Sequence, residues 1–367
     1  MRVRSPRLFG PLPRGSAAGR SLLAVTGLLV TFGTVAVASA SEGQASANGG
    51  PAWSITIHDL VYLGFGLGAL YVMARVRLAP LVRRAPLLIV AGLGLLAAVR
   101  LIGVTANGGT RWLNLHVIYL QPSEVFKLLT VLYLAWLVAH HGEDLDDGRR
   151  LAVATLPVSL GVGLIVLEPD FGTATVVVAV ALVMLAVAGL NRHLLTRVAG
   201  LGVLGFVAFI ALKPYAARRF FSFVHPSHDP LGSGYQLLQS KIALGAGGVT
   251  GLGLGHSRAK WGLLPNPHTD FIFTIVGEEL GLVGTLFVLA LFVWFLFSAT
   301  RIAQRAGDPV ARMVATGITT WICLEAVINV ASVVGGWAVT GIPLPFFSYG
   351  GTALITELAA VGLLYNV

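Results

Sequence analysis

The sequence predicts an all-α polytopic membrane protein with about ten transmembrane helices and one large extracytoplasmic loop. Of its 367 residues, 56% are hydrophobic and only 11% are charged, and the mean hydropathy is +0.82. Soluble domains contain roughly 25% charged residues, so this composition excludes a soluble protein. Apolar segments repeatedly reach the roughly 20 residues needed to cross the hydrocarbon core of a bilayer. Arginine residues also gather on one side of these segments.

The predicted spans and their connections form one integral membrane domain over residues 1–367. The spans lie near 21–40, 56–75, 86–104, 120–140, 151–167, 172–190, 194–212, 271–299, 311–336 and 349–367. Residues 213–270, between the seventh and eighth spans, form the large loop. Loops of this length are usually functional or disordered, and its amphipathic stretches and tryptophan favour a functional one. Residues 41–55 are rich in Ser, Gly and Ala and predict a flexible outer loop.

The positions of the basic residues predict the orientation. If the N-terminus is cytoplasmic, the short outer loops and the adjacent span ends contain only Arg100 and Arg111, and most other arginines lie inside. This is the positive-inside pattern, and it places both termini in the cytoplasm. It also accounts for most of the net charge of +9 without a nucleic acid partner. The single cysteine, Cys323, lies within a span and excludes a disulfide framework and a Cys-based metal site.

The first hydrophobic segment has two interpretations. Residues 21–39 follow five arginines and end in small residues, which is typical of a cleaved signal peptide. A signal anchor that remains as the first helix fits better, because nine further spans follow and the predicted topology needs it.

The segment RWLNLHVIYLQPSEVFK (111–127) contains an intramembrane charge pair. Glu124 and Lys127 are three residues apart near the start of a span, so they are neighbours on one helix face. Pro122 suits the first helical turn, and Gln121 and Ser123 are suited to bind its free amides. The pair is either a structural ion pair or part of a polar cavity, because charges within a bilayer are paired or face such a cavity.

A second polar motif, LEPDFGTA (167–174), occupies a short outer turn. Asp170 is suited to cap the helix that follows, and Gly172 allows a tight backbone. Glu168 and Asp170 are alternatively suited to bind a cation or to orient a sugar.

Within residues 215–270 the large loop places five cations on the outer side, against the usual bias. They are Arg218, Arg219, Lys241, Arg258 and Lys260. Cations at a membrane interface suit a lipid phosphate or pyrophosphate. The run Gly245 to Gly255 lacks the G-x-G-x-x-G spacing of a dinucleotide site and instead suits close backbone packing or amide contacts to phosphate. The histidines of this loop match no standard metal spacing.

Asp270 lies where the large loop enters the next span. It is suited to be the N-cap of the helix FIFTIVGEELG, or to be a catalytic carboxylate. Glu278 and Glu279 follow within that span, where only a cavity or a partner would tolerate them. The last polar segment, VTGIPLPFFSYGGTALI, is a proline-constrained outer loop that leads into the final span.

In this order, these segments resemble the SEDS family (shape, elongation, division and sporulation) of FtsW, RodA and SpoVE proteins. The matching segments are RWL…QPSEVFK (111–127), EPDFGTA (168–174), GSGYQLLQSKIALGAGG (232–248), GLGLGHSRAKWGLLP (251–265), HTDFIFTIVGEELGLVG (268–284) and PLPFFSYGGTAL (343–354). The G-L-G-x-S-x-x-K form of the loop is more similar to FtsW and SpoVE than to RodA. Asn266, His58 and Asp59 depart from the family pattern and leave the subgroup open.

The resemblance implies a peptidoglycan glycosyltransferase that polymerises lipid II on the outer face and releases undecaprenyl diphosphate. Asp270 matches the aspartate that would act as the general base, a role worth roughly 10²–10⁴ in rate. The residues expected to bind substrate are Arg111, Glu124, Lys127, Glu168, Asp170, Arg218, Arg219, Gln239, Ser240, Lys241, Ser257, Lys260, His268, Thr269 and Ser348. The resemblance allows a divalent cation, Mg²⁺ or Mn²⁺, to assist the departing diphosphate, and the sequence identifies no ligands for it.

The resemblance also implies a location and partners. The protein is expected in the bacterial cytoplasmic membrane, with an extracytoplasmic active site, a cognate class B penicillin-binding protein and other division or elongation proteins as partners. A lipid II flippase and a non-catalytic scaffold that recruits a transpeptidase are the alternatives. Because a flippase needs access from both faces and the polar motifs concentrate on the outer one, the sequence favours the enzyme. A role in division, elongation or sporulation is left open.

Overall fold

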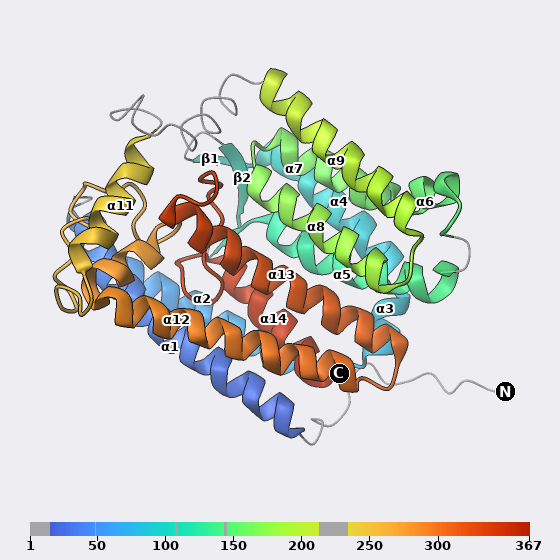
Figure 1. The fold of residues 1–367 in the computed structure, drawn as a ribbon, viewed down its shortest axis with the longest axis horizontal. Helices are drawn as coiled ribbons and strands as arrows, with labels where there is room; N and C mark the ends of the chain where they lie inside the picture. The colour runs from blue at the N-terminus through green and yellow to red at the C-terminus, as the bar shows by residue number, and fades with distance from the viewer. Residues whose placement is uncertain (1–14, 48, 107–108, 117, 143–144, 213–233) are drawn as a thin grey trace.

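A computed structural model describes residues 15–47, 49–106, 109–116, 118–142, 145–212 and 234–367 as a bundle of helices (Figure 1). In chain order the helices are α1 (Ala17–Ala47), α2 (Ser54–Met73), α3 (Leu78–Arg83), α4 (Ala85–Ile102), α5 (Pro122–His141), α6 (Gly148–Ala154), α7 (Leu156–Leu167), α8 (Phe171–Val187), α9 (Arg192–Leu212), α11 (Tyr235–Gly247), α12 (Ile272–Arg305), α13 (Pro309–Val334) and α14 (Thr352–Asn366).

Each of the ten predicted spans coincides with a helix or a pair of helices. Six of the described helices are long and apolar enough to cross a membrane, or seven if one bent pair counts as a single span. Two others, α8 and α14, are apolar but shorter. The protein is therefore a mostly helical, multi-pass membrane protein, and the number ten stays a prediction.

The segment predicted as one span over 151–167 is not a single straight helix. It consists of α6 and α7, which meet at an angle of 57°. Pro157 lies in the first turn of α7, just after the break. A proline in a helix interior removes a backbone hydrogen bond and clashes with the preceding turn, so the chain starts a new helix there.

A small antiparallel sheet corrects the all-α prediction between the third and fourth predicted spans. Its strands are β1 (Val104–Ala106), β2 (Gly109–Asn114) and β3 (Tyr119–Leu120), in the order β1-β2-β3. β-branched residues favour extended backbone, and the Oγ1 atoms of Thr105 and Thr110 lie 2.7 Å apart across the first pair. Helical periodicity across the spans gave no signal for these short strands.

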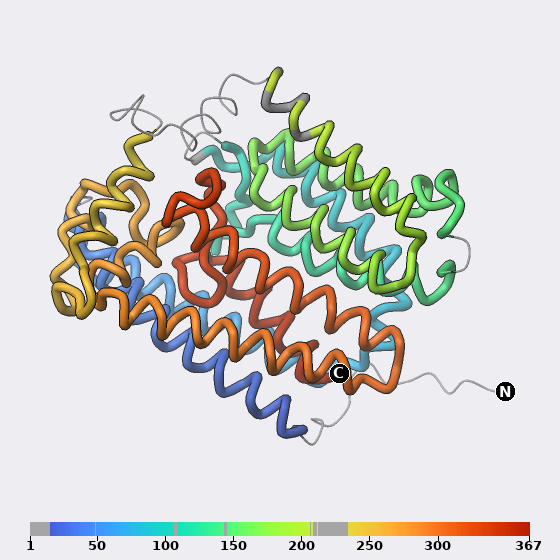
Figure 2. Tube along the Cα trace, in the orientation of Figure 1, coloured from blue at the N-terminus to red at the C-terminus, as the bar shows by residue number. Residues whose placement is uncertain are grey.

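Helix α1 extends to Ala47, so the prediction of a flexible loop over 41–55 is wrong for residues 41–47. The extension is held by Glu42, whose carboxylate lies 2.7 Å from Lys260 Nζ. At the other end of α1, the hydroxyls of Ser21 and Ser298 lie 2.8 Å apart. Figures 1 and 2 show α1 (blue) beside α12 (orange) along this length. These contacts favour a retained anchor helix over a cleaved signal peptide.

Helix α12 is interrupted at Gly281, whose φ of 66° and ψ of −159° are accessible essentially only to glycine. The interruption frees backbone groups that pair with the glycine-rich segment after α11. Leu252 N donates to Glu278 O at 3.0 Å, and Leu282 N donates to Gly248 O at 3.0 Å. The expected close backbone packing of the glycine run is therefore confirmed.

The polar elements are separated along the bundle. The strands, α11 and the segment that precedes α12 lie toward one end, and α3 and α6 lie toward the other (Figure 1). The end that contains α11 is called the loop end below. It contains the segments in which the candidate site is found.

Candidate functional site

Two of the sequence motifs meet at Arg111 in strand β2. Its guanidinium group donates to two main-chain carbonyls of the turn before α8, to Glu168 O at 3.0 Å and to Pro169 O at 2.5 Å. Arg111, which was expected to bind substrate, thus holds the turn that contains two other predicted site residues, Glu168 and Asp170.

Asp170 caps helix α8, as the sequence allowed. Its carboxylate accepts from Thr173 N at 3.2 Å and from Thr173 Oγ1 at 2.9 Å. Gln121 Nε2 also donates to it at 3.3 Å, and Gln121 N donates to Thr352 Oγ1 at 3.0 Å. Gln121 and Ser123 make no side-chain cap of α5, although Pro122 does begin that helix. This network joins the starts of α5, α8 and α14 at the loop end.

Glu168 is fully buried, at 0% exposure, and neither of its carboxylate oxygens has a hydrogen-bond partner among the described residues. Burial, together with the nearby charge of Asp170, raises the pKa of Glu168 to about 8, although Arg111 and Arg100 act in the opposite direction. The carboxyl group of Glu168 is therefore mostly protonated, and so mostly uncharged, at neutral pH.

Asp270 lies just before α12 and is half-buried. The residue that flanks the helix is Phe271, and no side-chain hydrogen bond caps this end, so Asp270 is not the N-cap. Its main-chain carbonyl accepts from Asn329 Nδ2 at 2.9 Å. A methyl group built on Gly341 would lie 3.5 Å from Asp270 Oδ2, which places the loop between α13 and α14 against the carboxylate.

The residues beside Asp270 connect it to the final loop. Tyr349 N donates to His268 O at 2.9 Å, and the two rings lie 5.6 Å apart. Burial lowers the pKa of His268 to about 4, so its imidazole is neutral at neutral pH. Thr269 is half-buried and its hydroxyl donates to Asn266 O. Ser348 is buried and its hydroxyl accepts from Leu344 N at 2.8 Å, which shapes the loop itself.

Helix α11 supplies three further predicted site residues. Ser240 is buried, and its hydroxyl lies 2.6 Å from Thr274 Oγ1 and donates to Val333 O at 2.8 Å. Gln239 is half-buried, and Lys241 is exposed beside Gly335 at the end of α13. Ser240 therefore joins α11 to α12 and α13, whereas Lys241 presents a charge to the surface.

The predicted residues Ser257 and Lys260 belong to a buried network with Glu278 and Glu279. Ser257 Oγ donates to Glu278 Oε2 at 2.5 Å, and the backbone amides of residues 258 and 259 donate to the same carboxylate. Lys260 Nζ lies 3.7 Å from Glu279 and donates to Glu42 Oε2 at 2.7 Å. These contacts supply the partners that the two intramembrane glutamates require.

The remaining loop cations differ in accessibility. Arg218 and Arg219 lie outside the described residues. Arg258 and Lys241 are exposed, whereas Lys260 is buried in its ion pairs. Of the described cations in this loop, Lys241 and Arg258 are therefore the ones open to an anionic group from outside.

Lys127 has a second carboxylate partner that sequence reasoning missed. Its Nζ lies 2.8 Å from Glu124 Oε2 and also contacts Glu325 of α13. The three side chains are at most 3% exposed. Glu325 Oε2 also accepts from Trp321 Nε1 at 2.7 Å, and Glu357 of α14 accepts from Phe346 N at 2.7 Å. A lone acid in each apolar span was the available signal for Glu325 and Glu357.

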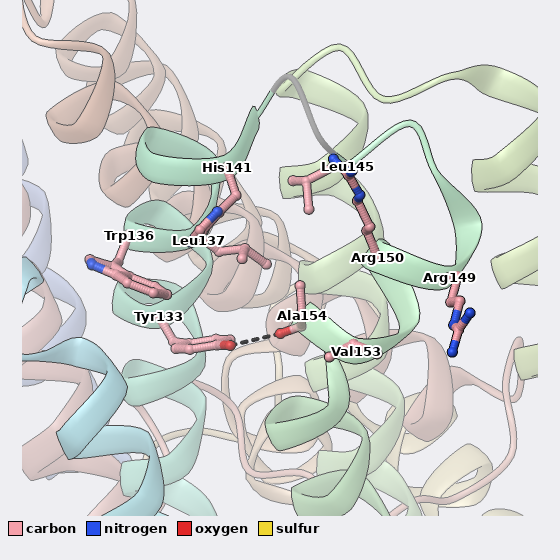
Figure 3. A pocket seen from close by; sticks show the side chains of 9 residues that line it. All are labelled: Tyr133, Trp136, Leu137, His141, Leu145, Arg149, Arg150, Val153 and Ala154. Carbon is pink, nitrogen blue, oxygen red and sulfur yellow. Dashed lines mark hydrogen bonds between the residues drawn. The ribbon is translucent and has the colours of Figure 1, made fainter.

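The cavity in Figure 3 lies away from these motifs. It has a volume of about 450 Å³ and is lined by α5, α6 and the segment between them, including Tyr133, Trp136 and Arg149. None of the predicted site residues lines it. Among the described residues, no three His, Cys, Asp or Glu side chains are grouped to hold a metal ion.

Comparison with known proteins identifies relatives along nearly the whole chain. The family of cell cycle proteins FtsW, RodA and SpoVE matches residues 20–367. The chain is 38% identical over 349 residues to stage V sporulation protein E of Bacillus subtilis. This match covers 94% of this chain and 95% of that protein. It is 39% identical over 352 residues to the probable peptidoglycan glycosyltransferase FtsW of Methylococcus capsulatus, with coverage of 94% and 88%.

Solved structures share the fold. A chain of a peptidoglycan synthase complex, described for its coordination of polymerization and crosslinking, superposes with a TM-score of 0.78. It is 31% identical, and the match covers 94% of this chain and 96% of that one. The rod shape determining protein RodA of Thermus thermophilus superposes with a TM-score of 0.67 at 28% identity, with 94% of both chains covered.

Removal of the buried cation should destabilise the bundle. Lys127→Met leaves Glu124 and Glu325 buried without their counter-ion, which we expect to cost about 3–5 kcal/mol of the free energy of unfolding. The thermal unfolding midpoint in detergent measures this. Addition of Glu325→Gln should restore part of the loss. Arg150→Met, which breaks an exposed pair with Asp147, should cost less than about 1 kcal/mol. Equal unfolding midpoints for Lys127→Met and wild type would contradict the role of Lys127 as the stabilising counter-ion of Glu124 and Glu325.

Glu168 should make stability depend on pH. Its folded pKa of about 8 exceeds its ordinary value of 4.5, so the folded protein keeps a proton that the unfolded chain releases between these values. The contribution to stability is complete below pH 4.5 and is lost as the pH rises through 8. The difference between the thermal unfolding midpoints of wild type and Glu168→Gln (wild type minus variant) should therefore fall as the pH rises from 4.5 to 8. His268, with its lowered pKa, affects both proteins equally. A constant difference would refute the prediction.

Proposed function

Because the chain belongs to the FtsW, RodA and SpoVE family of cell cycle proteins, we propose that it is a peptidoglycan glycosyltransferase that polymerises lipid II. The observation on which this rests most is the position of Asp270. Its half-buried carboxylate lies between the large loop and α12, it does not cap the helix, and contacts from the other motifs surround it.

The proposed reaction is an inverting glycosyl transfer. The 4-hydroxyl of the acceptor sugar loses its proton to the Asp270 carboxylate while its oxygen attacks the anomeric carbon of the donor. The bond from that carbon to the diphosphate breaks, and undecaprenyl diphosphate leaves. A general base in this position contributes roughly 10²–10⁴ in rate. The neutral imidazole of His268 is not a competing cation beside the base.

The location of the base suits an amphiphilic substrate. Lipid II has a polar sugar head and a prenyl tail, so its reacting bond lies where water meets the bilayer. The exposed side chains of Lys241 and Arg258 are placed on the loop to attract the departing diphosphate. Arg218 and Arg219 match the same expectation from the sequence. No step of this proposal passes through a divalent cation.

We also propose the location and a partner. The orientation has both termini in the cytoplasm of a bacterium and the loop end outside the cytoplasmic membrane, as the distribution of arginine predicts. The similar chain from a peptidoglycan synthase complex supports assembly with a class B penicillin-binding protein. Other division or elongation proteins are further candidates for the same membrane assembly.

Asp270→Asn tests the catalytic assignment. Asparagine keeps the shape and the acceptor oxygen but has no basicity, so the protein should fold and bind its penicillin-binding partner while polymerisation falls by roughly 10²–10⁴. The assay measures glycan strands made from labelled lipid II by the purified protein with its partner.

The matched control is Asp308→Asn, because Asp308 is a true N-cap whose carboxylate accepts from Val310 N at 3.2 Å. Asparagine caps helices about as well as aspartate, so this variant should remain active. A well-folded Asp270→Asn protein with near-normal polymerisation would remove Asp270 from the mechanism.

Thiol labelling tests the orientation. His256 is exposed at the loop end, and His193 is exposed in the first turn of α9, which is predicted to start in the cytoplasm. In a Cys323→Ala background, His256→Cys should react with an impermeant reagent in spheroplasts, whereas His193→Cys should react only after permeabilisation. The reverse result would invert the topology and place the proposed site in the cytoplasm.

A further inference from the structure

Asn329 is a buried amide near the C-terminal end of a membrane-length helix. It lies in α13 with 2% of its surface exposed. Its Nδ2 donates to two main-chain carbonyls, Asp270 O at 2.9 Å and Ile342 O at 2.8 Å. Because both partners are acceptors, only the NH₂ group can lie on this side, which determines the orientation of the amide.

The first of these bonds holds the chain at the proposed base. Asp270 precedes the residue that flanks α12, so its carbonyl lies outside the hydrogen-bond ladder of that helix. Asn329 replaces the missing helical partner. The backbone to which the Asp270 carboxylate is attached is therefore anchored to α13.

The second bond holds the loop between α13 and α14 that faces Asp270. Ile342 follows Gly341, which has a φ of 75° and faces Asp270, so that an added Cβ would lie 3.5 Å from Asp270 Oδ2. On its other side, the side chain of Ile342 packs directly on Gly172 of the turn motif. One amide thus sets the separation between the carboxylate and the loop beside it.

Stability alone does not explain this amide. Its Oδ1 is buried and has no hydrogen-bond partner among the described residues, and an unsatisfied buried acceptor destabilises a fold. Ser332, one turn further along α13, also joins this helix to the same loop, but its hydroxyl donates to Ala338 O and Ile328 O and not to the Asp270 carbonyl. Substitution of Ser332 therefore removes a bond to the loop alone, whereas substitution of Asn329 removes bonds to the loop and to the main chain of Asp270.

We propose that Asn329 is a positioning residue for glycosyl transfer, which orients the Asp270 carboxylate by holding its main chain and the facing loop together. The inference rests on the proposed role of Asp270 as the base. A misplacement of about 1 Å in a reacting group costs roughly 10²-fold in rate, so loss of these bonds should lower kcat while substrate affinity persists.

The experiment compares the kinetics of three variants of the full chain with labelled lipid II and the partner. Asn329→Ala removes both bonds and should lower kcat roughly 10- to 100-fold, with KM within about twofold of wild type. Asn329→Asp has nearly the same volume and retains at most one donor in either protonation state, so it should fold and lose at least about 10-fold in kcat. Ser332→Ala should leave kcat within about twofold.

The outcomes separate this inference from the proposed function. If Asp270→Asn is inactive but a folded Asn329→Ala or Asn329→Asp protein keeps kcat within about twofold of wild type, the positioning role is wrong and the base assignment stands. If Asp270→Asn is active, the proposed function itself fails. If Ser332→Ala loses as much kcat as Asn329→Asp, attachment of the loop alone explains the effect, and the positioning role is again wrong.

Discussion

Inside a bilayer the ammonium group of Lys127 has no water to solvate it, so its contacts with Glu124 and Glu325 constrain how α5 and α13 pack. The Trp321 indole donates to the same Glu325 carboxylate and adds a further contact within α13. Because α13 also contains Asn329, the charge cluster and the proposed site are attached to one helix. The position of Asp270 therefore depends on a bundle whose centre is held by buried charges rather than by apolar packing alone.

At the loop end, buried charged side chains are also paired, but with partners from the loop. Glu278 and Glu279 lie within α12, and their partners come from the loop: the Ser257 hydroxyl, backbone amides and Lys260. Lys260 in turn reaches Glu42 and so attaches α1 to the loop. Residues that resemble substrate ligands in sequence thus form much of the support of the site. Asp270 lies at the boundary of this support, half-buried between the loop and α12.

The sequence predicted the fold class and the positions of the helices that coincide with its predicted spans. It did so because hydrophobicity and charge are local properties that the bilayer selects directly. It missed the strands at 104–120, because two to six residues are too few for a periodic signal. It also missed the bend at Thr155, where Pro157 was visible but its effect on an otherwise apolar segment was not.

Asp270 illustrates what the sequence determines and what the tertiary structure determines. The sequence by itself determined that an aspartate stands between a polar loop and an apolar helix, and that acids and one lysine lie within spans. Only the tertiary structure showed that Asp270 does not cap α12 and which residues pair with one another: Asn329 with the Asp270 carbonyl, and Glu325, 198 positions away, with Lys127. The physical reason is that such contacts join residues far apart in the chain, so they depend on how whole helices pack against one another, and no local pattern records that packing.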